Sequence, residues 1–461
     1  MPAAALSSAR TIDRPRSSVP ALMVVALVGL AARAAFVRLY GPVVEGDSIT
    51  YLRIGQLLML GRLDEYDGAA PPAYGAFLQL FGGAPGPVQA AQSLLGTGIA
   101  VLTAWLVWRP TRHAGWAIAA GLAFGLALDT LCFEAYLVTE TFATAALVLS
   151  VALLTLALER PRPSALLTSS LSLALSLAGL TKPFLLFLFP LAALALAWRW
   201  RAAATLATRA TLAFVLPVAL LVGSWCWHNG VTQGVWGPST MTGYRLTQHV
   251  GSVMEDAPDR YRVVRDIFLA HRARLVAETG SPVNTIWRAI PDMQRATGLS
   301  YGRLSLEVNA MSVAVAKRHP MVLAKSIAIA WVRFWSRPMY LKPSYAHSPA
   351  ALRTLVTLAQ IERPLALGLN ALLLGLVAAG LVSARVRRRV PWTAWTFAVL
   401  IMVGSVLQAF AEHSDNGRFA VPFLPLVGAT LAIAATGLRR GAEPPGAPAA
   451  RQVAGVSRDP A

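Results

Sequence analysis

Long apolar blocks separated by short polar turns dominate the pattern along the chain. The blocks run for about 18 to 22 residues, the length at which a helix crosses a bilayer core of roughly 30 Å. The pattern therefore predicts an all-α polytopic membrane protein with about ten transmembrane helices. The predicted spans lie at about 21–40, 88–108, 115–131, 139–158, 165–180, 184–198, 210–227, 365–386, 392–411 and 419–438.

A long polar segment, 228–363, separates the seventh predicted span from the eighth, and we expect it to be mainly helical. Its stretch 320–338 is apolar enough for a span, but Lys325 and Arg333 lie inside it. A span there would also move the run Arg385–Arg389 to the opposite side of the membrane. We therefore interpret 320–338 as a helix at the membrane interface, with its two cations reaching outward.

These patterns divide the chain into five parts. Between the first two spans, 41–87 predicts an amphipathic surface helix from Ser48, ended by Gly61, and a second short helix after Pro71 and Pro72. The parts are a disordered cytoplasmic tail (1–20), a transmembrane module that includes this first outer loop (21–227), the polar outer segment (228–363), the last transmembrane helices (364–438) and a second disordered tail (439–461).

Composition and charge narrow the class of protein. Of the 461 residues, 56% are hydrophobic and only 14% are charged, against roughly a quarter charged in soluble domains. The net charge of +19 could suggest nucleic-acid binding, but much of it lies in short loops, where Lys and Arg set membrane orientation. We predict no nucleic-acid partner and place on the cytoplasmic side Arg109, Arg112, Arg160, Arg162, Arg199, Arg201, Arg385–Arg389, Arg439 and Arg440.

Two acidic sites, formed by three residues, then fall on the outer side, each next to a predicted span. Glu45 and Asp47 follow the first span, and Glu140 opens the fourth. A structural reading exists for each position, because Asp47 could be a helix N-cap and Glu140 could complement a helix dipole. A carboxylate at these positions could equally act as a general base.

Two basic positions lie on the same side. Lys182 sits in an apolar hairpin, and Arg418 opens the last predicted span. Lys182 could simply extend to the membrane surface, and Arg418 could be an ordinary loop residue. Both could also bind a phosphate of a lipid. No run of His, Asp or Glu has the spacing of a metal site, so a divalent metal is unsupported and no cofactor is firmly implied.

Taken together, carboxylates and cations at one membrane boundary suit a reaction in which a base activates a hydroxyl while cations hold a lipid-linked phosphate. The sequence resembles bacterial GT-C glycosyltransferases of the protein-mannosyltransferase and aminoarabinose-transferase type. The motifs that carry this resemblance are, in order, "GDSITY", "PPAYGAFLQLFGG", "TETF", "GLTKPFLL", "WHNGVTQGVWGPSTMTGYRL" and "GRFAVPFLPLV".

The resemblance implies a GT-C-like helix bundle that carries out an inverting sugar transfer at the outer face of the bacterial cytoplasmic (inner) membrane. The donor would be a sugar on a polyprenyl phosphate, membrane lipids would surround the protein, and the acceptor would be a lipid, a glycan or a protein. Two departures stand out, because Gly46 separates Glu45 from Asp47 where the family often has adjacent Asp-Glu, and His228 precedes Asn229 where Arg-Asn is common.

The same resemblance implies roles for individual residues. Asp47 matches the base of the first loop, with Glu45 as the alternative, and Glu140 matches a second acidic position near the site. The residues expected to bind the substrate or the lipid phosphate are Lys182, Arg418, Tyr244 and Arg333.

Two other functions remain open on the sequence. A secondary transporter places ionisable groups near the bilayer midplane, and the predicted spans hold few charges apart from Arg33, which we expect to reach toward the membrane surface. A lipid-carrier-dependent polymerase or ligase of another membrane fold would share the outer basic residues, but it would lack an acidic pair in the first loop.

Overall fold

The structure is a computed structural model that describes residues 17–201, 204–336 and 338–440, and helices dominate it. Most of both predicted disordered tails, 1–16 and 441–461, lies outside the described residues. In the described part, β-structure is limited to two isolated bridges, which join Tyr40 to Ala346 and Val43 to Tyr136.

Eight described helices are long and apolar enough to cross a membrane. A ninth candidate is the pair α5 and α6, which is bent by 48°, and α8, with 15 residues, falls short of a span by length. The all-α polytopic class is thereby confirmed, whereas the count of ten stays a prediction. The helices of the bundle are α1 (Val19–Leu39), α4 (Pro85–Thr111), α5 (Ala114–Gly125), α6 (Leu128–Ala135), α7 (Glu140–Glu159), α8 (Ala165–Gly179), α9 (Leu188–Trp200), α10 (Ala204–Gln233), α16 (Pro349–Val382), α17 (Ala384–Arg389), α18 (Trp392–Ala411), α19 (Asn416–Phe419) and α20 (Leu424–Arg440).

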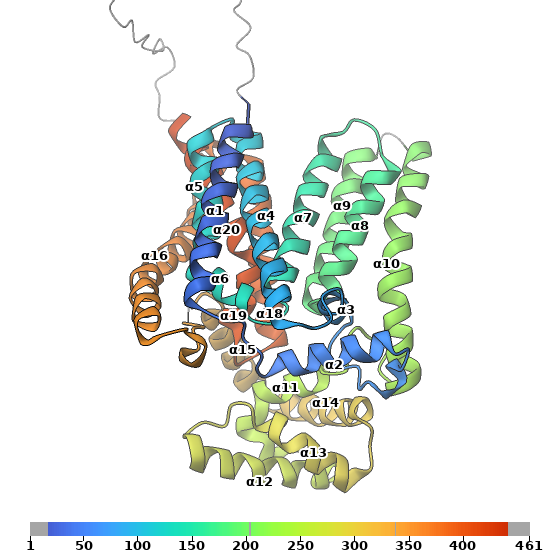
Figure 1. Ribbon diagram of the computed structural model, residues 1–461. Coiled ribbons are helices and arrows are strands. Elements are labelled where there is room, and N and C mark those ends of the chain that lie inside the picture. The colour runs from blue at the N-terminus through green and yellow to red at the C-terminus, as the bar shows by residue number, and fades with distance from the viewer. Residues whose placement is uncertain (1–16, 202–203, 337, 441–461) are drawn as a thin grey trace, which may run out of the picture.

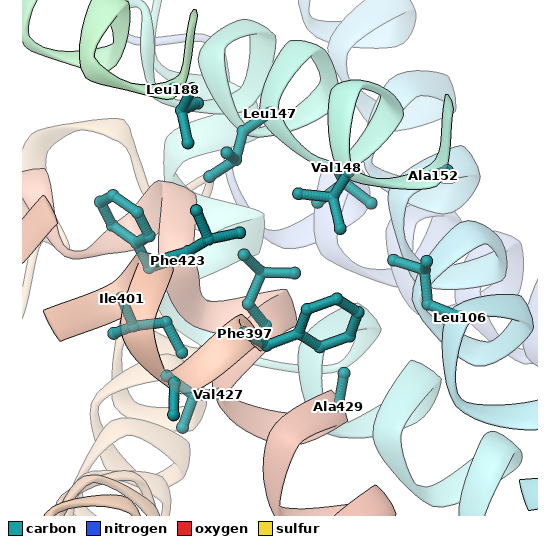
Figure 2. Close-up of a cluster of buried hydrophobic side chains, with 14 of the residues drawn as sticks. Leu106, Leu147, Val148, Ala152, Leu188, Phe397, Ile401, Phe423, Val427 and Ala429 are labelled. Carbon is teal, nitrogen blue, oxygen red and sulfur yellow. The ribbon is translucent and has the colours of Figure 1, made fainter. Parts of the chain in front are cut away.

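The largest apolar core lies among the long helices. Figure 2 shows Leu147 and Val148 of α7 turned toward Phe397 of α18, with Val427 of α20 nearby. Many core positions are alanine, which lets membrane helices approach closely where tight packing, rather than exclusion of water, stabilises the bundle.

A buried ion pair crosses this bundle between α1 and α6. Arg33 is only 3% exposed, and its Nη2 lies 2.5 Å from Oε1 of Glu134. Its Nη1 donates to the carbonyl oxygens of Gly29 at 3.0 Å and Gly125 at 3.1 Å. The expectation that Arg33 reaches toward the membrane surface is therefore wrong, because a paired guanidinium inside the bundle avoids the cost of an isolated charge in lipid.

The polar segment forms a smaller helical body with its own core. It contains α11 (Thr242–Val250), α12 (Arg262–Thr279), α13 (Thr285–Thr297) and α14 (Tyr301–Arg318), followed by α15 (Pro320–Phe334). Figure 1 shows α11 to α14 stacked beyond the ends of the long helices. The mainly helical character of this segment is confirmed. α15 has 15 residues and packs against α18, and its interfacial position remains a prediction.

Two short helices of the first loop lie between the bundle and this body. α2 (Asp47–Met59) and α3 (Ala73–Gln79) pack closely, because Gly55 and Gly75 leave room for backbone contact. Figure 1 shows α2 crossing the ends of the long helices. Both helices were predicted, and Gly61, with φ +67°, ends the turn after α2 as expected.

The arginine-bearing turns gather at the opposite end. Arg109 Nε donates to Oε1 of Glu159 at 2.7 Å, and Arg199 Nε donates to the carbonyl of Leu158 at 2.8 Å. The guanidinium of Arg439 lies 5.2 Å from the ring centroid of Trp116. These contacts join the ends of α4, α7 and α9 and, separately, the ends of α5 and α20, and Figure 1 shows these ends at one side of the bundle. Short 3₁₀ helices complete the fold at Leu63–Glu65, Pro183–Phe187, Gly251–Asp256, Asp259–Tyr261, Pro343–Tyr345 and Val421–Phe423.

Candidate active site

Glu140 forms the centre of a charged cluster at the end of the bundle nearest α2. It is the first residue of α7 and is fully buried. Its Oε1 accepts hydrogen bonds from Lys182 Nζ at 2.9 Å and from Arg418 Nε, and its Oε2 accepts one from Arg418 Nη2 at 3.3 Å. Both carboxylate oxygens are thus occupied by cationic donors, as a buried charge requires.

Lys182 reaches this cluster from the turn between α8 and the 3₁₀ helix Pro183–Phe187. The residue is 5% exposed, so it points inward and does not extend to the membrane surface. Its ammonium lies 4.2 Å from the ring centroid of Phe419, a cation–π contact that adds to the pairing with Glu140. Burial lowers the pKa of Lys182, and the adjacent carboxylate of Glu140 opposes that shift.

Asp47 is the solvent-accessible member of the same cluster. Its Oδ2 accepts a hydrogen bond from Arg418 Nη1 at 2.8 Å, and its side chain is 54% exposed. α2 begins at Asp47 itself, and Gly46 occupies the N-cap position, so Asp47 is not the N-cap. Arg418 therefore joins a buried carboxylate to an accessible one.

Glu45 lies apart from that cluster. Gly46 has φ +54°, a conformation that glycine adopts without steric cost, and it turns the chain between the two acids. Glu45 instead pairs with Lys342 at 3.2 Å, and the two side chains are 40% and 50% exposed. The departure from adjacent acidic residues thus gives the two carboxylates different partners.

Tyr51 and Phe419 belong to the cluster and were not singled out as site residues. Tyr51 follows Asp47 by one helical turn and is surrounded by Asp47, Arg418 and Glu140; burial and the charge of Asp47 raise the pKa of its hydroxyl. Its spacing of four residues from Asp47 was a usable signal. Phe419 had no comparable signal, since its role depends on contact with Lys182 from a distant turn.

A second charged pair borders the cluster on the side of α11. Arg245 Nη1 lies 3.4 Å from Oε2 of Glu412, and its guanidinium is 5.9 Å from the ring centroid of Phe419. Arg245 thus faces the same aromatic ring as Lys182. Position 228, where the sequence has His instead of the expected Arg, lies elsewhere, because His228 Nε2 hydrogen-bonds the carbonyl of Leu63 at 3.1 Å.

Two of the predicted binding residues lie outside this cluster. Tyr244 is buried in the core of the polar segment and donates to the carbonyl of Tyr301 at 2.6 Å. Arg333 donates to Nε2 and to the carbonyl of His413, both at 3.2 Å. The structure therefore brings together Asp47, Glu140, Lys182 and Arg418, and it leaves Glu45, Tyr244 and Arg333 with other partners.

The cluster combines two functions that a transfer reaction needs. Lys182 and Arg418 are cations that could bind a phosphate, and Asp47 is an accessible carboxylate beside them. Across residues 17–201, 204–336 and 338–440, no group of three His, Cys, Asp or Glu side chains could hold a metal ion.

No family model matches the chain, and no curated protein sequence matches it. Among solved structures, the chain is similar to the crystal structure of ArnT from Cupriavidus metallidurans bound to undecaprenyl phosphate. The likeness covers 90% of this chain and 78% of the other, with 15% sequence identity and a TM-score of 0.39. A likeness of this degree assigns no residue role and no substrate to this chain.

Proposed function

We propose that this protein is a membrane glycosyltransferase that moves a sugar from a polyprenyl-phosphate carrier to a hydroxyl of a lipid, glycan or protein acceptor. The observation that carries the proposal is the bridge made by Arg418, which contacts both the accessible Asp47 and the buried pair of Glu140 and Lys182. A base and two cations thus lie at one point, at the end of an apolar bundle.

The two cations suit the lipid phosphate of the donor. Lys182 is a compact charge and Arg418 a planar donor with several N–H groups, and both types of side chain bind phosphate oxygens. Because they lie at the ends of apolar helices, a lipid tail could remain in the membrane while its phosphate meets them. As the phosphate leaves, its growing negative charge would be stabilised by groups that are already in place.

The two carboxylates have different roles in this proposal. Glu140 has both oxygens bound by cations and is fully buried, so we assign it the positioning of Lys182 and Arg418. Asp47 has one such contact and an exposed side chain, so we assign it the role of general base. Hydrogen-bond reach to the acceptor is the first requirement for that role.

The reaction follows from this assignment. The acceptor oxygen forms a bond to the anomeric carbon while the bond from that carbon to the phosphate oxygen breaks. The electron pair of the broken bond leaves with the polyprenyl phosphate, and the proton of the acceptor passes to Asp47. Attack from the face opposite the phosphate inverts the anomeric centre, and phosphate leaves without the general acid that a glycosidase needs.

We place the reaction at the outer face of the bacterial cytoplasmic membrane. The support is that the charged cluster lies at the end of the bundle opposite the arginine-bearing turns, and short arginine-rich loops stay in the cytoplasm.

The test is the substitution Asp47→Asn in the purified full-length protein, supplied with a labelled polyprenyl-phosphate sugar and crude envelope acceptors. Loss of the base should lower turnover by at least about 10²-fold. The melting temperature should change little, because the side chain is half exposed. Glu45→Gln is the matched control and should retain most turnover. Full activity of Asp47→Asn would contradict the assignment.

The same preparation separates this function from transport. A transporter would move its substrate into proteoliposomes without forming a covalent product, whereas a transferase yields labelled acceptor and free polyprenyl phosphate. A lipid-carrier polymerase would yield chains of increasing length from the carrier alone, so product size distinguishes that alternative.

A further inference from the structure

A cavity of about 330 Å³ lies between α11, the start of α13 and α15, apart from the charged cluster. Its wall includes Gln248 and His249 at the end of α11, Phe268 of α12, and Val322 and Ile329 of α15. The volume is at the lower end of the range of small-molecule sites. The cavity belongs mainly to the polar segment, so a ligand there would be approached from water.

Two buried polar atoms at this cavity lack hydrogen-bond partners among the residues that the structure describes. They are Nε2 and Oε1 of the Gln248 side-chain amide. A buried polar atom without a partner costs free energy, so these atoms are expected to bind either water or a ligand. Together they offer both donor and acceptor groups.

The polar groups of the wall are mainly neutral. Burial, with a smaller effect of nearby His413, lowers the pKa of His249 to about 4, so the imidazole is uncharged at neutral pH. Lys325 is exposed at the edge of the cavity and is the one Lys or Arg among the described lining residues. Neutral donors and acceptors beside the apolar faces of Phe268 and Ile329 match a sugar ring, which has hydroxyls on its edge and C–H groups on its faces.

The cavity is connected to the charged cluster by two routes. Along α11, Arg245 faces Phe419 and His249 lines the cavity four residues later, a separation of about 6 Å along the helix axis. Across the cavity wall, Ser326 Oγ hydrogen-bonds His249 Nδ1 at 2.9 Å and His413 Nδ1 at 2.8 Å. His413 lies in the same turn as Arg418, so the turn that bears the proposed phosphate ligand also closes the cavity.

We propose that this cavity binds a neutral sugar ring of the acceptor, one helical turn along α11 from Arg245 at the border of the charged cluster. The inference rests on the proposed transferase function. The donor sugar is bonded to the phosphate and must lie at Lys182 and Arg418, whereas the cavity belongs to the polar segment. An acceptor that carries a sugar would use the cavity for recognition and present its hydroxyl to Asp47.

Binding is tested directly by saturation-transfer NMR on the full-length protein in a sugar-free detergent. The probes are the methyl glycosides of glucose, galactose and mannose. At least one should bind to the wild-type protein. Gln248→Leu should weaken binding by about five- to tenfold, as expected for the loss of a hydrogen-bonding group. His271→Phe, outside the cavity, is the matched control and should bind normally.

Gln248→Leu should not destabilise the fold, because the Gln248 amide makes no hydrogen bond that the substitution would remove. Gln248→Leu should therefore melt at the same temperature as the wild-type protein or higher. Absence of binding by all three glycosides would mean that the cavity holds water only, and undiminished binding by Gln248→Leu would place the bound glycoside elsewhere. Either result would overturn the proposal.

Two further measurements distinguish an acceptor site from a donor site, and they distinguish failure of this proposal from failure of the catalytic assignment. In the transfer assay, Gln248→Leu should raise the acceptor concentration for half-maximal rate by about five- to tenfold and leave that of the donor unchanged; the reverse would contradict an acceptor site. Asp47→Asn should bind glycosides normally, so failure of the catalytic assignment and failure of this cavity give different results.

Discussion

At the scale of single residues, the site depends on one arginine with two acidic partners. Arg418 holds the buried Glu140 through Nε and Nη2 and the exposed Asp47 through Nη1. A lysine has the same charge but no planar fork, so it cannot make these contacts at once. The geometry of Arg418, more than its charge, therefore fixes where the proposed base lies.

We expect Arg418→Lys to lower turnover by about 10²-fold or more, the loss typical of removing one preorganised group that stabilises developing charge. The rate with labelled polyprenyl-phosphate sugar measures this effect. Arg109→Lys, in the exposed pair with Glu159 at the opposite end of the bundle, should leave the rate unchanged. An equal loss in both variants would indicate a general effect of arginine replacement.

α7 contains a buried and an exposed glutamate, each in an ion pair, so it allows a test of how burial changes the contribution of an ion pair to stability. Glu140→Gln leaves Lys182 and Arg418 buried without their anion, and breaking a buried pair costs about 3–5 kcal/mol. Glu159→Gln breaks a pair whose side chains are 30% and 44% exposed, and such pairs contribute about 1 kcal/mol or less. Thermal unfolding in detergent should therefore show a large drop for Glu140→Gln only. Similar drops would contradict the role of burial.

At the scale of elements, α4 shows how one small residue admits a charged pair into the bundle. A Cβ on Gly96 would overlap the carboxylate of Glu134 and the guanidinium of Arg33. Gly98 lies two residues further along the same helix, and nothing lies within 4 Å of a Cβ there. The two glycines thus lie in the same helix, but an added Cβ would meet other side chains at Gly96 and open space at Gly98.

Gly96→Ala should lower stability by about 1–3 kcal/mol through overpacking, and it should displace the ion pair. Gly98→Ala should be neutral or stabilising by about 0.5–1 kcal/mol, because alanine favours the helix. The midpoints of thermal unfolding of the two variants test this contrast. A stable Gly96→Ala would mean that Arg33 and Glu134 can repack without cost.

At the scale of the whole molecule, the chain has two unlike ends. One end gathers the turns with Arg109, Arg199 and Arg439, and the other carries α2, the charged cluster and the body formed by α11 to α14 (Figure 1). From the positive-inside rule we propose that the body lies outside the cell membrane. In the proposed function, orientation and reaction are linked, because a donor on the outer leaflet would meet Lys182 and Arg418 there.

Cysteine labelling in intact cells tests this orientation. Arg274 of α12 and Arg388 of α17 are both exposed. Figure 1 shows α12 in the body beyond the bundle, whereas Arg388 precedes Arg389, whose carbonyl lies beside Gly437 near the end of α20. In a background with Cys226→Ser, which leaves only the buried Cys132, a membrane-impermeant maleimide should label Arg274→Cys and not Arg388→Cys. After the cells are opened, both should react. The reverse pattern would place the charged cluster in the cytoplasm and contradict the proposed location.

The sequence by itself determined the parts of this protein that depend on local chemistry. Apolar length marks the membrane helices, Gly61 marks the end of the surface helix, and arginine-rich turns indicate one shared face, because each property belongs to a short stretch of chain. The same reasoning found Asp47, Glu140, Lys182 and Arg418, since a charge beside an apolar block stands out.

Only the tertiary structure decided which of these groups lie in contact. Glu45 and Asp47 are two residues apart but take different partners, Arg33 pairs with Glu134 across 101 positions, and Arg418 meets Glu140 across 278. The same holds for the cavity beside His249, whose walls come from separate helices. Such contacts depend on how distant segments pack, and a charge in a packed interior must find its partner wherever the fold brings one.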